Sequence, residues 1–389
     1  MTMIFSEADE RFRQDVRSFL KAELTDDLRE AGRRCTGIYC DHGPANAWHR
    51  ILAAKGWSVP HWPVEYGGTG WTPLQHYVFE CELAAAGAPA RTPNATHMVA
   101  PVIMAFGTDT QKAELLPRIR SGEDWWAQGY SEPGAGSDLA SLRCAAGRDG
   151  DGYVINGSKI WTTHAHFSNR IFCLVRTRPD GKPQAGISFL LFDLDLPGIT
   201  IRPIISISGD HELNEIFFDN VRVPVSALLG AENDGWTVAK YLLQHERSHN
   251  WSPLLRSRLN RLRDQAAATP GGSMLDDPVF AARLSRIDIA ITTLEISELR
   301  ILTGDIAGEA AAIIPSIMKV RGTELRQQLT ELALDVAGRA AAIGPGAALA
   351  PGYEEAADAM SIYLNDRAAS IYAGTNEIQR NIIGASLLR

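Results

Sequence analysis

Residues 130–138 read YSEPGAGSD, and this stretch says more about fold and chemistry than any other in the chain. Its two glycines and one proline exclude a plain strand or helix and indicate a tight turn with exposed backbone N–H groups. Such groups, together with the hydroxyls of Ser131 and Ser137, suit the carbonyls, ring nitrogens and phosphates of a nucleotide cofactor. A surface turn has the same composition, so the residues alone leave both interpretations open.

The hydrophobic pattern changes period around this turn and divides the chain into three regions. Residues 1–122 show mainly helical spacing, and residues 123–235 contain short runs rich in Val, Ile and Phe separated by turn pairs. Residues 236–389 return to long amphipathic helical patterns. We therefore expect an α+β fold with an N-terminal helical domain, a middle antiparallel β domain shaped as a small barrel or sandwich, and a C-terminal helical bundle.

Composition excludes several classes of protein. The chain has 389 residues, of which 45% are hydrophobic and 22% charged, as in an ordinary soluble globular protein. The net charge of −8 gives no basic surface for nucleic acid, and no apolar run approaches the roughly 20 residues of a membrane helix. The N-terminus does not read as a signal peptide, so we expect a cytoplasmic location and reduced cysteines.

Two small groups of residues raise the question of a metal site. Cys35, Cys40 and His42 lie close together in the sequence, and His164 and His166 are two positions apart. The first group matches no common zinc pattern, and no second ligand pair follows it. The two histidines stand at a spacing that metal ligands also show, but we interpret them as loop residues at the edge of the cofactor site. We expect both groups to be loop residues and predict no metal.

Four stretches together resemble the acyl-CoA dehydrogenase family: YSEPGAGSD, KIWTTHA, FFDNVRVP and YAGTNEIQRNIIG. They occur in the family's order and at about its spacing, and the resemblance covers essentially the whole chain. It implies a helical N-terminal domain, a middle β domain and a C-terminal four-helix bundle, which agrees with the order of patterns above. It also implies FAD as cofactor and removal of two hydrogens from the α and β carbons of an acyl-CoA thioester.

The resemblance assigns cofactor contacts position by position. Tyr130 and Ser131 would lie along the flavin ring, and Ser137 would approach both the cofactor phosphates and the pantetheine arm of CoA. Trp161 would pack on the isoalloxazine, and Thr163 would bond near N5 and O4. Without the motif, Trp161 would be interpreted as an ordinary aromatic residue of the β-domain core. The remaining cofactor contacts that the resemblance implies are Thr162, Thr375, Asn376 and Glu377.

The resemblance differs among family members in the position of the catalytic base. Many family members carry a glutamate where this chain has Ala373, and alanine cannot accept the α proton. In members resembling isovaleryl-CoA dehydrogenase, the glutamate comes from an early helix of the bundle and directly precedes an arginine. Glu246 and Arg247 match that pair, so the resemblance makes Glu246 the base and places Arg247 beside the substrate. By itself, a Glu-Arg pair on a helix is usually solvated.

Ala373 retains a second role that the resemblance implies. The backbone N–H at this position would donate to the thioester carbonyl, with Gly374 also contacting the substrate, and any residue except proline supplies that N–H. The missing side chain also leaves room near the α carbon. We therefore expect a branched, dicarboxylic or bulky acyl chain.

The chain lacks two segments that many homotetrameric members use to reach a neighbouring subunit's FAD. These read RxxFG and QxxGGxG; Arg256, Arg258 and Arg261 lie near the first position, but no FG follows. In this the chain resembles the large subunit of pimeloyl-CoA dehydrogenase and the large chains of paired bacterial enzymes acting on steroid side chains. That resemblance implies a tetramer, here an α2β2 assembly with a second acyl-CoA dehydrogenase-like subunit.

The sequence is compatible with three functions. The first is a dehydrogenase that passes electrons to electron-transfer flavoprotein. The second is an oxidase that passes them to oxygen, although such oxidases are usually longer chains. The third is a non-catalytic partner subunit, which Ala373 and the missing RxxFG segment would suit and which Glu246 argues against.

Overall fold

The computed structural model contains two compact units that combine distant parts of the sequence. It describes residues 5–246, 250–269, 272–306, 308–342 and 354–388, and side chains within these ranges except at 245–246, 308–312 and 354–355. We call the first the helical unit; it consists of Met1–Trp48, Gly70–Ala90 and His249–Arg389. We call the second the β unit; it consists of His49–Thr69 and Arg91–Ser248.

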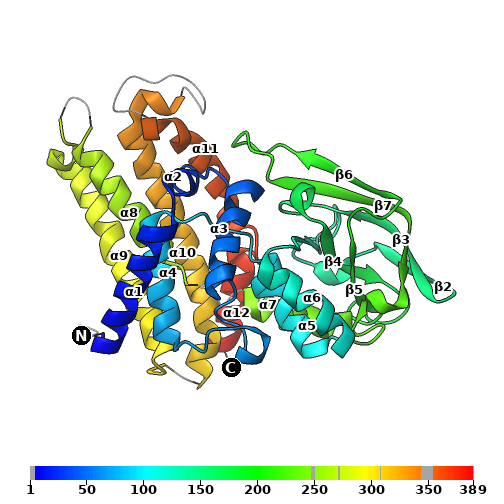
Figure 1. The fold of residues 1–389 in the computed structure, drawn as a ribbon. Helices are drawn as coiled ribbons and strands as arrows, with labels where there is room; N and C mark the ends of the chain where they lie inside the picture. Colours follow the sequence, from blue (N-terminus) through cyan, green and yellow to red (C-terminus); the bar gives the residue numbers. More distant parts are fainter. Residues whose placement is uncertain (1–4, 247–249, 270–271, 307, 343–353, 389) are drawn as a thin grey trace. The chain divides into compact units, whose positions relative to one another are not determined.

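The helical unit is a set of packed helices in which α10 has the most neighbours (Figure 1). Helices α8, α9 and α10 pack against one another, α4 packs on α1 and α8, and α11 and α12 pack on α10. The helices are α1 (Glu7–Glu23), α2 (Asp26–Arg33), α4 (Pro73–Ala86), α8 (Ser252–Ala267), α9 (Pro278–Leu302), α10 (Gly308–Ala337), α11 (Ala359–Asp366) and α12 (Asn376–Leu387). Helix α3 (His42–Lys55) contains the boundary between the units.

Local sequence sets where several helices begin and end. Ser6, Thr72 and Thr108 each form a capping box, in which the hydroxyl accepts the N–H three residues on and that residue's side chain accepts the cap N–H. Gly87 and Gly122 end their helices in the left-handed conformation that glycine adopts without a Cβ penalty. These signals are readable in the sequence.

The β unit is built on one eight-stranded sheet in the order β6-β7-β3-β2-β4-β5-β8, with β1 pairing β4. Its strands are β1 (Trp126–Gly129), β2 (Ala145–Asp149), β3 (Gly152–Lys159), β4 (Arg170–Arg176), β5 (Ile187–Asp193), β6 (Ile199–Ile204), β7 (Leu213–Pro224) and β8 (Leu228–Leu229). Most pairings are antiparallel, as predicted, whereas β1–β4 and β2–β4 are parallel. Its helices are α5 (Ala100–Phe106), α6 (Asp109–Ser121) and α7 (Gly235–Glu246), and a π-helical segment spans Asn94–Val99.

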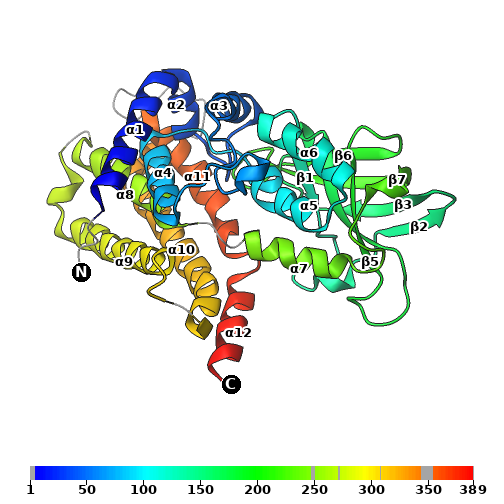
Figure 2. The same cartoon turned by 60° about the horizontal axis from the view of Figure 1, so that its bottom comes forward.

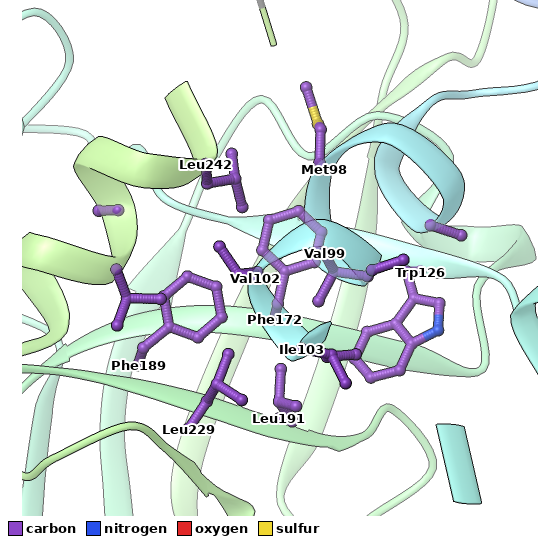
Figure 3. Close-up of a cluster of buried hydrophobic side chains, with 14 of the residues drawn as sticks. Met98, Val99, Val102, Ile103, Trp126, Phe172, Phe189, Leu191, Leu229 and Leu242 are labelled. Atoms are coloured by element: carbon purple, nitrogen blue, oxygen red, sulfur yellow. The ribbon is translucent and has the colours of Figure 1, made fainter. Parts of the chain in front are cut away.

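Strand β4 is buried on both faces, which explains why its sequence is a continuous apolar run instead of an alternating one. Phe172 and Leu174 belong to one hydrophobic cluster, and Ile171, Cys173 and Val175 belong to another. The first cluster lies between the sheet and helices α5 and α7; Figure 3 shows Phe172 beside Phe189 of β5. The two rings are parallel, with centroids 5.9 Å apart.

Helix α7 is fixed by this same cluster. Val238, Ala239 and Leu242 are almost fully buried in it, and Figure 2 shows α7 running beside β5. Burying such side chains stabilises a docked helix by about 1.5–3 kcal/mol for each large aliphatic residue. The sheet therefore holds the helix that ends at Glu246. None of the helices described is both long and apolar enough to cross a membrane.

Candidate functional site

The YSEPGAGSD stretch forms the tight turn that its composition predicts. The N–H of Glu132 donates to the carbonyl of Ala135 and the N–H of Ala135 donates back to Glu132, both at 3.0 Å. A Cβ added to Gly134 or Gly136 would meet no atom within 4 Å. The turn is thus closed by its own backbone and presents an open face. Next to it, Ser131 is half-buried and Ser137 is exposed.

A buried ion pair locks this turn to the sheet. Lys159, the last residue of β3, is fully buried, and its Nζ donates to Oε1 of Glu132 at 2.8 Å and to the carbonyl of Tyr130 at 3.1 Å. The Glu132 carboxylate also accepts the N–H groups of Arg143 at 2.6 Å and Cys144 at 2.9 Å. Because all these polar atoms are satisfied by one another, the charges tolerate burial. Sequence reasoning assigned this pair no role.

The second predicted flavin segment, Trp161 to Thr163, lies directly beside the first. The N–H of Ile160 donates to the carbonyl of Ser131 at 2.9 Å, which joins the two segments edge to edge. The Trp161 backbone is left-handed, with φ at +62°, and its side chain is 57% exposed. A non-glycine residue in this region costs about 1–3 kcal/mol, so the surrounding structure must impose it. Such a large exposed aromatic on a strained backbone favours a ligand surface over a core role.

Thr162 supplies the polar counterpart to this aromatic surface. It is 1% exposed, and its Oγ1 has no hydrogen-bond partner in the part of the chain that the structure describes. Buried hydroxyls are nearly always paired, so such a group indicates a missing partner. An open turn, an exposed indole and a buried hydroxyl that has no partner among the described residues together fit a planar cofactor that carries hydrogen-bonding atoms, as flavin does.

The YAGTNEIQRNIIG stretch lies in the helical unit and forms the turn that starts α12. Ala373 and Gly374 are consecutive left-handed residues, with φ at +54° and +80°. The Thr375 hydroxyl caps the helix by accepting the N–H of Ile378 at 3.2 Å. The sequence therefore forces a sharp change of direction at Ala373, which is the position that lacks the glutamate.

The side chains that follow this turn are used within the helical unit. The buried amide of Asn376 pairs with Oγ1 of Thr323, with Nδ2 donating at 3.1 Å. The Glu377 carboxylate is mostly exposed and lies 3.6 Å from Arg380. The flavin contacts assigned to Thr375, Asn376 and Glu377 remain predictions.

The assigned base and its neighbour fall at the edge of what the structure describes. Position 246 is the last residue of α7, one turn beyond the buried Leu242, but the Glu246 side chain and Arg247 lie outside the described residues. The two assignments therefore remain predictions. As for metal binding, no group of three or more His, Cys, Asp or Glu residues in the described part of the chain could hold an ion.

The arginines near the missing RxxFG segment are all engaged inside the helical unit. Each has a partner within hydrogen-bond distance: Asp288 and Glu295 for Arg256, Asp366 for Arg258, and the carbonyl of Arg33 for Arg261. Arg326, which is buried, also pairs with Asp366. These hydrogen bonds and ion pairs favour a structural role for the arginines over binding of another subunit's cofactor.

Comparison with known proteins agrees with these features. Three family models match in succession: the acyl-CoA dehydrogenase N-terminal domain over residues 6–123, the middle domain over 127–221 and the C-terminal domain over 233–388. Acyl-CoA dehydrogenase IpdE1 of Mycobacterium tuberculosis is 38% identical, over 97% of each chain. Acyl-CoA dehydrogenase FadE26 of the same organism is 34% identical, over 99% of this chain and 97% of that one.

Solved structures give the same result. The ChsE4-ChsE5 complex from Mycobacterium tuberculosis matches with a TM-score of 0.84 and 32% identity, over 100% of this chain and 99% of that one. The Tcur3481-Tcur3483 steroid ACAD matches with a TM-score of 0.85 and 29% identity, over the same shares. The predicted α+β fold is confirmed, and the chain belongs to the acyl-CoA dehydrogenase family of flavin-dependent oxidoreductases.

Proposed function

We propose that this chain catalyses the FAD-dependent α,β-dehydrogenation of an acyl-CoA thioester to a trans-2-enoyl-CoA. The observation that carries the proposal is the pair of adjoining segments in the β unit, where Trp161 is exposed on a strained backbone beside the buried Thr162 hydroxyl. When bound, FAD supplies a hydride acceptor at N5 for the β carbon of the substrate. The protein's part is to hold the reactants and to remove the α proton.

Each residue then has a defined task. Tyr130 and Ser131 line the flavin ring, Trp161 packs on it, and Thr162 and Thr163 bond its polar edge. The contacts assigned from the helical unit are Thr375, Asn376 and Glu377. Ser137, whose turn is open and exposed, approaches the cofactor phosphates and the pantetheine arm.

Proton removal falls to Glu246. The α proton of a thioester is far less acidic than a carboxylic acid, so the base must face it in a dry pocket while the thioester oxygen is polarised. The backbone N–H of Ala373 supplies that polarisation, Gly374 adds a backbone contact, and Arg247 lies beside the substrate. The left-handed turn at Ala373 supports this assignment, because it sets the direction of the backbone there independently of any side chain.

The substrate is a bulky, branched or dicarboxylic acyl chain, and a steroid-derived one has the strongest support. A solved relative is described as a steroid ACAD, and Ala373 leaves space where other members place a glutamate. A preference for straight-chain over 2-methyl-branched or steroid-derived acyl-CoAs in initial-rate measurements would contradict this part.

The assembly is an α2β2 tetramer with a second acyl-CoA dehydrogenase-like subunit, and electron-transfer flavoprotein accepts the electrons. Two relatives of known structure are named as two-component complexes, and the arginines nearest the missing motif are committed to internal partners. Expression alone and together with the genomic neighbour, followed by mass determination and flavin quantification, tests it. An active, flavin-loaded homotetramer from the single chain would rule it out.

The deciding experiment is anaerobic titration of the flavin-loaded protein with acyl-CoA, comparing wild type with Glu246→Gln. We expect substrate to bleach the flavin absorbance of the wild type. The variant should keep its flavin but bleach more slowly by about 10²–10⁴-fold, which is the usual contribution of a general base. Gln244→Ala, an exposed change on the same helix, should bleach normally. Unchanged bleaching in Glu246→Gln would refute the base assignment.

The same measurement separates the two alternatives. If wild type and variant both fail to bleach with every acyl-CoA tested, the chain is a non-catalytic partner subunit. If bleaching occurs and air then yields peroxide at the catalytic rate, the protein is an oxidase.

A further inference from the structure

We infer that Asn214 is a positioning residue that holds the Trp161–Thr163 segment in the conformation required for flavin binding; the inference rests on the proposed function. Asn214 lies near the start of β7 and is fully buried. It lies 52 positions from Thr162 in the sequence, and no motif points to it. Its contacts single it out.

Asn214 forms hydrogen bonds with both the backbone N–H and the backbone carbonyl of Thr162. The N–H of Thr162 donates to the backbone carbonyl of Asn214 at 3.0 Å, and Nδ2 of Asn214 donates to the carbonyl of Thr162 at 3.0 Å. These two bonds fix the two peptide planes that flank Thr162. A trans peptide places its C=O and N–H on opposite sides, and the chain has no cis peptide among the described residues. Anchoring the Thr162 carbonyl to Asn214 therefore turns the N–H of Thr163 away from β7.

A histidine pair holds the Asn214 amide in this orientation. Its Oδ1 lies 2.9 Å from Nε2 of His211, and Nδ1 of His166 lies 3.2 Å from Oδ1 and 3.0 Å from Nδ2. The two imidazole rings stack with centroids 3.8 Å apart. In the tautomer that carries its proton on Nε2, His211 donates to Oδ1, which leaves Nδ2 to donate to the carbonyl of Thr162. The histidines thus orient the Asn214 amide, and the amide in turn holds the carbonyl of Thr162.

The neighbouring backbone needs such a clamp. Trp161 and His164 are both left-handed, with φ at +62° and +54°, so two strained residues bracket Thr162 and Thr163. Strained conformations persist only where the surroundings impose them. The bond from Ile160 to Ser131 fixes one end and Asn214 fixes the middle. Without the amide, the segment can relax while the rest of β7 stays in register.

The test compares Asn214→Ala and Asn214→Asp with Asn94→Ala, using the chain expressed with its genomic neighbour. Asn94 is a matched control, since it is a buried asparagine of the same unit whose Nδ2 donates to a backbone carbonyl, that of Trp126, at 3.0 Å. The readouts are the dissociation constant of FAD from fluorescence titration of the apoprotein, the absorbance spectrum of bound flavin, and Tm.

We expect all three variants to lower Tm, but only the Asn214 variants to weaken FAD binding, by about tenfold or more, and to shift the flavin spectrum. Tenfold corresponds to about 1.4 kcal/mol, the size of one net hydrogen bond. The aspartate is nearly isosteric and keeps the acceptor for His211 but cannot donate to Thr162, so it tests the donor even if the alanine variant does not fold. Wild-type FAD affinity and spectrum in Asn214→Asp would overturn the inference. A wild type that binds no FAD would instead overturn the proposed function.

Discussion

Replacing Glu298 by glutamine should change how the stability of the helical unit depends on pH. Glu298 lies on α9, is 4% exposed, and caps the start of α8. Its carboxylate accepts the N–H of Trp251 at 2.6 Å, the N–H of Ser252 at 3.2 Å and the Ser252 hydroxyl. Burial raises the pKa of this carboxyl to about 7, against the downward pull of these hydrogen bonds.

The magnitude follows from the two pKa values. The folded value of about 7 lies about 2.5 units above the ordinary 4.5, and at 1.36 kcal/mol per unit this is about 3 kcal/mol. The folded state binds the proton more tightly than the unfolded state. Stability is therefore lost as pH rises from about 4.5 to about 7, where ionisation imposes a charge on a buried site. Glutamine cannot ionise, so the stability of the variant should not fall with pH in this way.

Thermal unfolding of wild type and Glu298→Gln at pH 5 and pH 8 measures the effect. Between pH 5 and pH 8 the variant should gain stability relative to wild type. The gain should correspond to about 2–3 kcal/mol in the free energy of unfolding, whatever the difference in Tm at pH 5. Glu23→Gln, an exposed change on α1, should show no such movement. If the difference between wild type and Glu298→Gln is the same at both pH values, the carboxyl does not titrate in this window and the reasoning is refuted.

Two further changes test the scaffold of the flavin segments. Lys159→Met leaves the buried Glu132 carboxylate without its counter-ion. We expect the free energy of unfolding measured in urea to fall by about 3–5 kcal/mol, and FAD retention on gel filtration to weaken. An unfolding free energy within error of wild type would show that the pair is dispensable. Gly157→Ala places a Cβ 2.8 Å from the Cys144 backbone at a φ of +143°, so we expect it to lower the free energy of unfolding by roughly 2 kcal/mol or more. In the control Gly147→Ala the added Cβ meets no atom within 4 Å, and the free energy of unfolding should change by less than about 1 kcal/mol. Equal effects would contradict the steric argument.

The sequence was sufficient for the fold because its signals are local. Helical and strand periods separate the α, β and α regions, and the caps at Ser6, Thr72 and Thr108 are readable where they occur. The parallel pairing of β1 with β4 was not predicted, because β1 is only four residues long and follows a helix without alternation. The boundaries at 122 and 235 remain predictions, and the compact units combine segments from across them.

For the site, the motifs located the flavin segments but not what holds them. Lys159 meets Glu132 across 27 positions, and Asn214 meets Thr162 across 52. Neither pair has a pattern in the local sequence, because the contacts exist only once the sheet has set its register. For Glu246 the situation is reversed. The sequence identifies this residue as the candidate base, but its side chain lies outside the described residues.

The helical unit combines segments that are far apart in the sequence, and this has a consequence for synthesis on the ribosome. Its Tyr77 hydroxyl bonds the Ser252 hydroxyl at 2.9 Å across 175 positions, so α4 emerges long before the helix that completes its packing. The β unit, ending at Ser248, is fully translated before that helix begins. We therefore expect the β unit to fold first, while the face of α4 that packs on α8 is still exposed. Exposed apolar surface of this kind makes nascent chains prone to aggregate or to recruit chaperones.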